Sequence, residues 1–346
     1  MKELFEKLPV VLLPWYRAHK RELPWRRDTL PYHVWLSEIM LQQTRVEAVK
    51  GYYTRFLAAL PTVDALAAAD EDLLYKLWEG LGYYSRVRNL KKAAQEIVAK
   101  YDGVFPGEYS KILTLPGIGE YTAGAIGSIC FGLRTPAVDG NVLRVISRIT
   151  NDQTPIDLPA YKKQVRESLA EVYPTQAGDF TQALMELGAT VCGPNRKPDC
   201  ACCPCKAFCL GYLNATAENL PVKLPKRGKR QEEWTVFIFS CNGSYAVEKR
   251  ENRGLLAGLW QFPNQKGKLE VQHALDIAQE MGLQPRQILR SLERQHIFTH
   301  VVWEMRGYYL EVSEPKGSYQ WLTTEEIEKE AALPTAFRQF WEAREQ

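Results

Sequence analysis

The sequence predicts two domains of different class, a mainly α-helical N-terminal domain and an α/β C-terminal domain. Three observations lead to this prediction. Helical periodicity dominates residues 1 to about 213, six of the eight cysteines crowd into residues 192–209, and strand-like alternation begins at Trp234. A chain of 346 residues is also too long for one ordinary hydrophobic core. We expect domains at 1–217 and 234–346, joined by a linker at 218–233.

Composition narrows the class of protein. A hydrophobic content of 45% and a charged content of 25% are typical of soluble globular chains. No apolar run approaches the ~20 residues that span a bilayer, and the N-terminus has neither the charge pattern nor the cleavage site of a signal peptide. Only Cys130 and Cys241 lie outside the cysteine-rich loop, unlike a secreted disulfide framework. We therefore expect a reduced, cytoplasmic protein without a membrane partner. The net charge of +3 does not by itself indicate a polyanionic partner.

The N-terminal elements follow from apolar spacing. The stretch VWLSEIMLQQTRVEAVKGYYTRFLAAL (34–60) has apolar residues at steps of three and four, which predicts an amphipathic helix. Similar patterns predict helices around 71–79, 86–100, 109–114, 120–131, 140–149, 159–172 and 178–190.

The C-terminal elements follow a different pattern. Residues 218–233 are polar, with two prolines and a basic run, as in a linker. From Trp234, WTVFIFSCNGSYAVEKR alternates across an Asn-Gly turn, which predicts a β-hairpin. A helix at 268–282 and strands around 296–312 complete the predicted α/β domain.

The loop CGPNRKPDCACCPCKAFC (192–209) favours metal binding. Zinc usually takes cysteine pairs that are a dozen or more residues apart, whereas one compact thiolate loop suits an iron–sulfur cluster better. Zinc remains the alternative. Spacing leaves the ligands ambiguous, because Cys202 and Cys205 form a second, overlapping C-x2-C. We interpret these two as surface thiols.

Two carboxylates stand out in the helical domain. Glu38 shares an apolar stripe with Val34 and Leu41, and burial would raise its pKa and make it a general acid near neutral pH. Asp139 heads the helical pattern AVDGNVLRVISRI, either as an N-cap or as a charge that faces a developing cation. Carboxylates in two unlike environments suit hydrolysis of a glycosidic bond.

Two further stretches predict contacts with nucleic acid. LTLPGIGEYTAGAIGSICFG (113–132) places Gly117 and Gly119 before a helix, where exposed N–H groups would bind phosphate without reading sequence. EGLGYYSRVRNLKKAA (79–94) combines Tyr83 with Arg86 and other bases, which suits phosphate contact and insertion of a ring into a base stack. A structural loop and a solvated basic helix face are the alternatives.

These motifs together, WLSEIMLQQT, GLGYYSRVRNL, LPGIGEYTAGAI, VDGN and the cysteine loop, resemble the helix-hairpin-helix DNA glycosylases of the endonuclease III superfamily. Within the superfamily they are most similar to the adenine DNA glycosylases. The resemblance implies a [4Fe–4S] cluster held by the pattern C-x6-C-x2-C-x5-C. That pattern selects Cys192, Cys200, Cys203 and Cys209, with seven residues instead of six in the first gap. It also implies that Arg196 and Lys197, in that gap, contact DNA phosphates.

The resemblance implies a role for each matching residue. Glu38 would protonate adenine at N7. Asp139 would stabilise the oxocarbenium ion or bond to it transiently, supported by Asn141 and Tyr121. Gln43 and Tyr83 would wedge into the duplex while adenine is flipped out.

Bifunctional relatives carry a lysine at the position of Tyr121. The resemblance therefore implies a monofunctional enzyme.

The C-terminal stretch RGLLAGLWQFP (253–263) resembles Nudix-fold proteins. The metal-binding R-E-x-x-E-E helix is degraded here to LDIAQE (275–280), so pyrophosphate hydrolysis is not expected. Phe298, Thr299 and His300 match the family's F-S-H motif, which recognises 8-oxoguanine, and the hydroxyl is kept. Ordinary packing in the β domain is the alternative.

The predicted function is monofunctional removal of adenine from double-stranded DNA that carries A:8-oxoguanine or A:G mispairs. We expect a monomer in the cytoplasm, associated with the nucleoid. The alternatives are a bifunctional endonuclease III-type glycosylase-lyase, a non-catalytic DNA-binding or redox-sensing protein with a cluster, and a Nudix nucleotide hydrolase.

Overall fold

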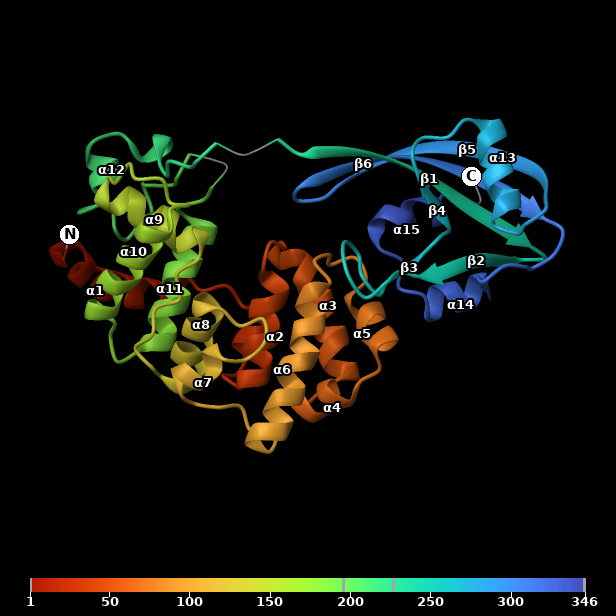
Figure 1. Cartoon of the computed structure of the whole chain (residues 1–346). Coiled ribbons are helices and arrows are strands. Elements are labelled where there is room, and N and C mark those ends of the chain that lie inside the picture. The colour runs from red at the N-terminus through yellow and green to blue at the C-terminus, as the bar shows by residue number, and fades with distance from the viewer. Residues whose placement is uncertain (1, 195–196, 226–227, 345–346) are drawn as a thin grey trace. The chain divides into compact units, whose positions relative to one another are not determined.

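The computed structural model describes residues 2–194, 197–225 and 228–344 (Figure 1). The chain divides into two compact units, residues 1–68 with 88–225 (unit 1) and residues 69–87 with 226–346 (unit 2). The sequence predicts that residues 69–87 belong with the N-terminal domain, whereas the structure groups them with the C-terminal residues. The linker and domain boundaries at 217 and 234 stay predictions.

Unit 1 is built from helices, as predicted. They are α1 (Lys2–His19), α2 (Pro31–Leu41), α3 (Val46–Ala59), α4 (Val63–Ala68), most of α6 (Ser85–Tyr101), α7 (Tyr109–Leu113), α8 (Glu120–Phe131), α9 (Gly140–Thr150), α10 (Pro159–Val172), α11 (Ala177–Thr190) and α12 (Leu210–Leu213), with short 3-10 turns at Pro24–Arg26 and Ala217–Asn219.

The predicted single helix over 34–60 is wrong, because α2 ends at Leu41 and α3 begins only at Val46. Gln43 between them adopts φ 58°, a left-handed conformation that a continuing helix does not allow. The break exposes Gln43 at a turn.

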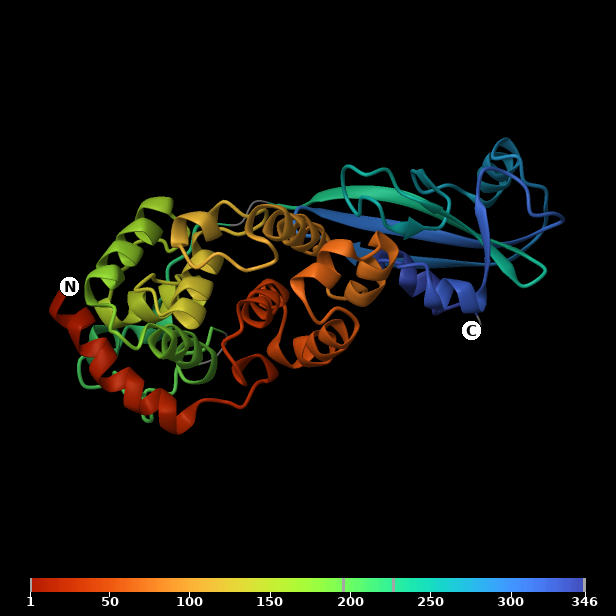
Figure 2. The same cartoon turned by 90° about the horizontal axis from the view of Figure 1, so that it is seen from below.

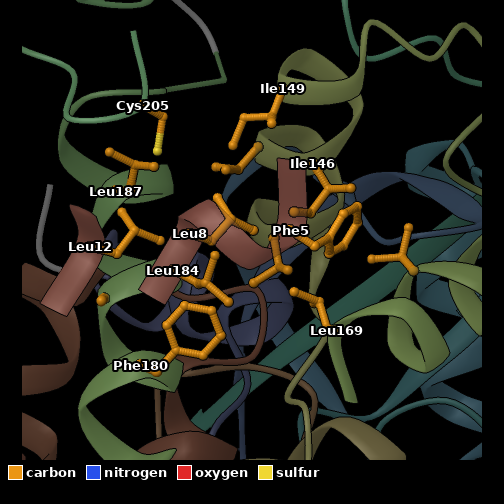
Figure 3. Close-up of a cluster of buried hydrophobic side chains, with 14 of the residues drawn as sticks. Phe5, Leu8, Leu12, Ile146, Ile149, Leu169, Phe180, Leu184, Leu187 and Cys205 are labelled. Atoms are coloured by element: carbon orange, nitrogen blue, oxygen red, sulfur yellow. The ribbon is translucent and has the colours of Figure 1, made fainter. Parts of the chain in front are cut away.

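One hydrophobic core of unit 1 lies between α1, α9, α10 and α11 (Figure 3). Helix α1 packs along α10 and α11 (Figure 2). Its residues Phe5, Leu8 and Leu12 are spaced by three and four, so they lie on one helix face. That face is buried against apolar side chains of α9 and α11, including Phe180, Leu184, Leu187, Ile146 and Ile149.

Unit 2 contains a mixed sheet of the order β3-β2-β1-β6-β5, with β4 beside β1 and β7 beside β2. The strands are β1 (Arg230–Cys241), β2 (Ser244–Lys249), β3 (Trp260–Gln261), β4 (Asn264–Lys266), β5 (Pro285–Ile297), β6 (Val301–Val312) and β7 (Gln320–Thr323); the helices are α5 (Glu71–Trp78), α13 (Val271–Glu280), α14 (Thr324–Lys329) and α15 (Thr335–Trp341).

Strand β1 starts earlier than the predicted strand at Trp234, and the turn that follows it is the predicted one. The strand begins inside the predicted linker, because Arg230 through Ser240 pair in parallel with β6. The turn to β2 has φ 49° at Asn242 and 82° at Gly243, as expected for an Asn-Gly hairpin.

Both faces of the sheet are covered, which explains the continuous apolar run in β1. Val236 and Ile238 pack on the side of α14 and α15. Phe237 and Phe239 alternate with them and pack on the side of α13. The fold class predicted from the sequence, helical followed by α/β, is thus the observed one.

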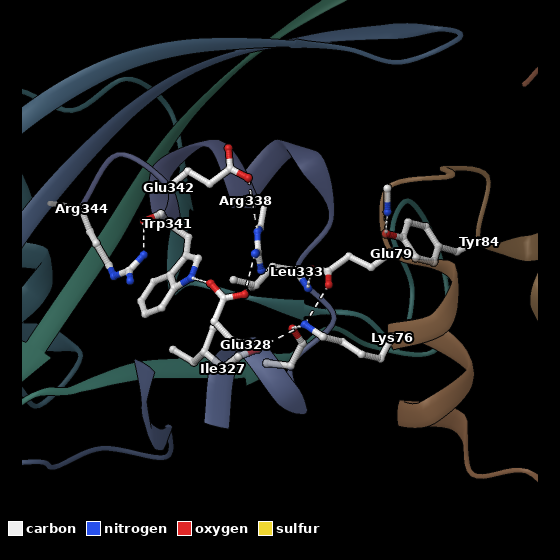
Figure 4. Close-up of polar contacts among 12 residues, drawn as sticks. Lys76, Glu79, Tyr84, Ile327, Glu328, Leu333, Arg338, Trp341, Glu342 and Arg344 are labelled. Atoms are coloured by element: carbon white, nitrogen blue, oxygen red, sulfur yellow. Dashed lines mark hydrogen bonds and ion pairs between the residues drawn. The ribbon is translucent and has the colours of Figure 1, made fainter. Parts of the chain in front are cut away.

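Helix α5 joins unit 2 through polar contacts (Figure 4). Lys76 Nζ donates to the carbonyls of Ile327 and Ala331 at 3.4 and 3.3 Å, and the Leu333 N–H donates to Glu79 Oε1 at 3.0 Å. These bonds connect segments that are about 250 residues apart in the chain. Among the described residues, the helices are all too short or too polar to cross a membrane.

Candidate active site

Glu38 lies in α2 among apolar neighbours and is only 6% exposed. The hydroxyl of Tyr121, from the first turn of α8, donates a hydrogen bond of 2.6 Å to Glu38 Oε2. Burial raises the pKa of Glu38 to about 7, an effect that the Tyr121 bond and the charge of Arg26 partly offset. The side chain is therefore substantially protonated at neutral pH, as the sequence predicts.

Asp139 is the N-cap of α9, and its Oδ1 accepts from the Val142 N–H at 2.8 Å. Asn141 Nδ2 donates to the other carboxylate oxygen at 2.6 Å. Burial raises the pKa of Asp139, while the hydrogen bonds from Val142 and Asn141 lower it. The N-cap interpretation is confirmed, and the capping carboxylate also lines a cavity; its role toward a developing cation stays a prediction.

That cavity brings the predicted catalytic residues together. It lies within unit 1, has a volume of about 1050 Å³, and is lined by Glu38, Tyr121, Asp139, Asn141 and Gln43, among others. The volume matches that of a small-molecule or flipped-base site. Two carboxylates thus line one cavity; burial raises the pKa of both, and different hydrogen-bond donors offset it, Tyr121 at Glu38 and Val142 with Asn141 at Asp139.

A cluster of ion-paired side chains in the wall of this cavity is not predicted by the sequence. The carboxylate of Glu186 is fully buried and pairs with Arg21 at 2.7 Å and with Arg26 at 2.7 Å. Burial alone would raise the pKa of Glu186, but the two guanidinium groups override it and lower the pKa to about 2. Because Arg26 and Glu186 are 160 residues apart, no local pattern reveals the pair.

Two further arginines connect the cavity to the cysteine loop. Arg144 and Arg148 lie four residues apart on α9 and so share a face. Arg144 donates to Asn141 Oδ1 at 2.9 Å and to the Cys192 carbonyl at 2.8 Å. Arg148 donates to the Cys192 sulfur at 3.2 Å. A continuous set of hydrogen bonds therefore runs from Asp139 to the first cysteine of the loop. The apolar helix pattern with two arginines four apart is the signal that would have predicted it.

The cysteine loop folds around a second cavity in unit 1. Cys192, Cys200, Cys203, Cys205 and Cys209 all line it, together with Arg148 and apolar residues of α9 and α11. No three metal-ligating side chains in the described ranges converge closely enough to share one metal ion. A donor set made only of sulfur, with an arginine N–H aimed at one sulfur, fits a cluster in which each thiolate binds a different iron.

The interpretation of Cys202 and Cys205 as surface thiols is wrong for Cys205. Cys202 is exposed, as expected for a surface thiol, but Cys205 is 0% exposed and belongs to the hydrophobic core of unit 1. The turn that contains Cys205 packs against α9 and α11. Their apolar side chains bury the thiol, because its own segment has few apolar residues. Figure 3 shows Cys205 beside Leu187.

The predicted phosphate clamp lies between α7 and α8. Leu115 and Ile118 are buried and hold the loop to the domain, whereas Gly117 and Gly119 are exposed. Gly117 adopts φ 75°, and a Cβ atom there would lie 2.6 Å from Asn89 Cβ. Glycine is therefore required at this position for both backbone and contact reasons.

Tyr83 and Arg86, in unit 2, differ in exposure. Tyr83 adopts φ 48° and its side chain is 45% exposed, so its ring is accessible as predicted. The predicted phosphate contact of Arg86 is contradicted, because Arg86 is 8% exposed and donates to the carbonyls of Leu81 and Gly82 at 3.0 Å. Its guanidinium lies over the rings of Trp78 and Tyr83. Burial lowers the pKa of Arg86 to about 10, and the residue supports the loop instead of facing solvent.

The predicted lesion-reading residues form the tip between β5 and β6. Thr299 and His300 are exposed, and the Thr299 hydroxyl lies 3.1 Å from that of Tyr83. Phe298 is half-buried against His296 and Trp303, so packing accounts for its ring.

The predicted basic contacts in the cysteine loop are only partly described. Lys197 is exposed and pairs with Glu218 at 2.9 Å. Arg196 lies outside the described residues.

Two protein families match this chain, one in each predicted domain. The family described as HhH-GPD superfamily base excision DNA repair protein matches residues 36–175, and the NUDIX domain family matches residues 235–343. These matches define the class as a base excision DNA repair protein with an additional Nudix-type domain.

Similar individual proteins show to which family of repair proteins the chain belongs. The adenine DNA glycosylase of Homo sapiens is 35% identical over 94% of this chain and 72% of its own length. That of Arabidopsis thaliana is 38% identical over 75% of this chain, which spans 47% of the plant protein. The chain belongs to the adenine DNA glycosylase family, a family of DNA N-glycosylases that act in base excision repair.

A solved structure agrees with the fold of part of the chain. The structure of a thermostable thymine-DNA glycosylase is 28% identical and covers 61% of this chain and 98% of its own, with a TM-score of 0.56. The family resemblance that the sequence motifs imply is therefore confirmed.

Proposed function

We propose that the protein is a monofunctional adenine DNA glycosylase that removes adenine opposite 8-oxoguanine or guanine in double-stranded DNA. The observation that carries this proposal is the pair Glu38 and Asp139, which line one cavity in different environments. The relatives named adenine DNA glycosylase support the choice of base.

The chemistry follows from the protonation states. Glu38, with a pKa of about 7, gives its proton to N7 of the flipped adenine. The bond between C1′ and N9 then breaks, and its electron pair leaves with the base, which departs neutral. Asp139 faces the positive charge that forms on the sugar, electrostatically or by a transient bond. Water adds to C1′ and returns a proton to Glu38, which restores the acid.

The lack of a lyase step follows from Tyr121. A lyase needs an amine that forms a Schiff base with C1′. At the position where bifunctional relatives carry this lysine, the chain has the phenol of Tyr121, which donates its hydrogen bond to Glu38. The product is therefore an abasic site in an unbroken strand.

The remaining predicted site residues contact DNA. Gly117 and Gly119 would bind phosphate through backbone N–H groups, with Lys197 and Arg196 adding charge. Gln43 and Tyr83 sit at exposed left-handed turns that would present their side chains to the base stack. Thr299 and His300 would recognise 8-oxoguanine, and a monomer suffices for these contacts.

Cys192, Cys200, Cys203 and Cys209 would hold a [4Fe–4S] cluster, which in this position supplies structural support and not reaction steps. Cys192 is tied to α9 through Arg144 and Arg148. The loop that carries Lys197 is thereby held at a fixed place on the domain.

The test is base release from a duplex with one adenine opposite 8-oxoguanine, analysed with and without hot alkali. We expect strand cleavage only after alkali, with A:G as a second substrate and A:T as the negative control. Cleavage without alkali would contradict the monofunctional proposal and favour a glycosylase-lyase. The matched variant Glu38→Gln keeps the shape and the Tyr121 bond, and it should bind the duplex without releasing adenine. Binding without release by the unmodified protein would favour a non-catalytic DNA-binding protein.

A further inference from the structure

The cavity beside α9 and α11 is lined by five cysteines, one more than a four-iron cluster needs. Cys205 is the additional thiol once the family pattern has selected the other four. It is fully buried, whereas Cys202, the sixth cysteine of the loop, is exposed. Cys205 is thus part of the cavity wall and not a surface thiol.

Cys205 also lies close in the chain to one of the ligand positions. Cys203 and Cys205 both line the cavity, and the two residues belong to one tight turn. In that turn the Lys206 N–H donates to the Cys203 carbonyl at 3.1 Å, and the Phe208 N–H donates to the Cys205 carbonyl at 3.2 Å. Both cysteines therefore reach the cavity from this one turn.

The surroundings keep the Cys205 side chain at this place. Leu187 and Val191 line the same cavity, and Leu187 lies beside Cys205 (Figure 3). Because Cys205 lines the same cavity from the same turn as Cys203, a change of its χ1 rotamer can bring its sulfur toward the iron that Cys203 would hold. Thiolate is a preferred ligand for iron–sulfur clusters, so an iron that loses the Cys203 thiolate has a replacement of the same chemistry nearby.

We infer that Cys205 is a reserve ligand of the cluster, able to replace Cys203 on the same iron. In the exchange, the bond between iron and the Cys203 sulfur is lost, and a bond to the Cys205 sulfur forms. The Cys205 proton passes to the released Cys203 thiolate, so neither the net charge nor any oxidation state changes. This inference rests on the proposed cluster, and it concerns a thiol outside the family pattern.

The test measures iron and acid-labile sulfide per chain, with the electron paramagnetic resonance spectrum of the oxidised cluster, in purified variants. The unmodified protein and Cys205→Ser should both carry about four of each. Cys203→Ser should stay soluble and keep at least half of the iron. Cys203→Ser/Cys205→Ser should keep less than a tenth. The control Cys203→Ser/Cys202→Ser should match Cys203→Ser, because Cys202 faces solvent.

The outcomes separate the two proposals. Loss of iron or of soluble protein in Cys203→Ser, with Cys205 intact, would overturn the reserve ligand and leave the cluster proposal standing. Retention of iron in the double variant that lacks Cys203 and Cys205 would overturn it as well. An unmodified protein without iron would overturn the cluster itself, and with it the inference. A changed spectrum in Cys203→Ser that disappears on removal of Cys205 would support the exchange directly.

Discussion

Tyr121 and Glu38, which are 83 residues apart in the chain, are joined by a hydrogen bond of 2.6 Å in which the phenol donates to the carboxylate. A donor at this position stabilises the charged form of Glu38 and so lowers its pKa. The pKa of about 7 is therefore a balance between burial and the Asp139 charge, which raise it, and the Tyr121 bond and the Arg26 charge, which lower it. The balance makes the pH dependence of the reaction sensitive to Tyr121.

Tyr121→Phe should move the alkaline limb of the pH–rate profile to higher pH. The phenyl ring fills the same space but no longer stabilises the carboxylate, so the pKa of Glu38 rises and the acid stays protonated further into the alkaline range. Single-turnover base release between pH 6 and 9 measures the shift. An unchanged or acid-shifted limb would show that Glu38 is not the group whose protonation limits the rate.

Glu38→Gln should stabilise the fold at alkaline pH and not at acidic pH. The pKa of Glu38 is raised from 4.5 to about 7 on folding, so its contribution to stability is present below 4.5 and is lost as pH rises through 7. The free energy of unfolding of the variant should exceed that of the unmodified protein by on the order of 3 kcal/mol at pH 8.

Urea unfolding at pH 5 and pH 8 measures this difference. Glu3→Gln, at an exposed position of α1, is the control and should show no pH-dependent gain. An equal effect of Glu38→Gln at both pH values would mean that the buried carboxyl does not titrate as described.

Gly117→Ala should destabilise unit 1 and weaken DNA binding, whereas Gly119→Ala should be tolerated in stability. Gly117 has φ 75° and would place a Cβ 2.6 Å from Asn89 Cβ, but Gly119 has no heavy atom within 4 Å of the corresponding position. Strain of this kind costs on the order of 1–3 kcal/mol. Chemical denaturation and titration with an abasic duplex measure the two effects. Similar losses for both variants would argue against the special role of Gly117.

Arg144→Met should slow base release more than it weakens binding of the duplex. The side chain holds Asn141 Oδ1 and the carbonyls of Cys192 and Gly188, and an unsatisfied buried partner costs about 1–3 kcal/mol. Without Arg144 the amide of Asn141 is free to rotate away from Asp139, so we expect at least a tenfold slower single-turnover rate.

Arg166→Met is the matched control, because Arg166 pairs near the surface with Glu120 and should cost under about 1 kcal/mol. Equal rates of base release for the two variants would show that the α9 arginines do not contribute to catalysis.

The sequence predicts the two buried carboxylates of the cavity better than the residues that surround them. Glu38 and Asp139 are detectable because a carboxylate on an apolar stripe or at a helix start is a local anomaly. The cluster of Glu186 with Arg21 and Arg26 depends on α11 meeting the N-terminal segment, a contact that no local spacing encodes. The end of the helix before Gln43 could not be predicted for a related reason. The residue that adopts the left-handed conformation is a glutamine, and no glycine or proline indicates the turn. The burial of Cys205 likewise comes from helices outside its own loop.

The grouping of residues 69–87 with 226–346 has a consequence for the order in which the chain folds. During translation, residues 88–225 must be made before the partners of α5 begin to appear, which at ~5–20 residues per second takes roughly 7–28 s. Throughout that interval Lys76 and Glu79 lack the backbone groups of Ile327, Ala331 and Leu333 that they bind in the finished protein. Helix α5 is thus an early part of the chain whose native packing waits until residues 327–333 have left the ribosome.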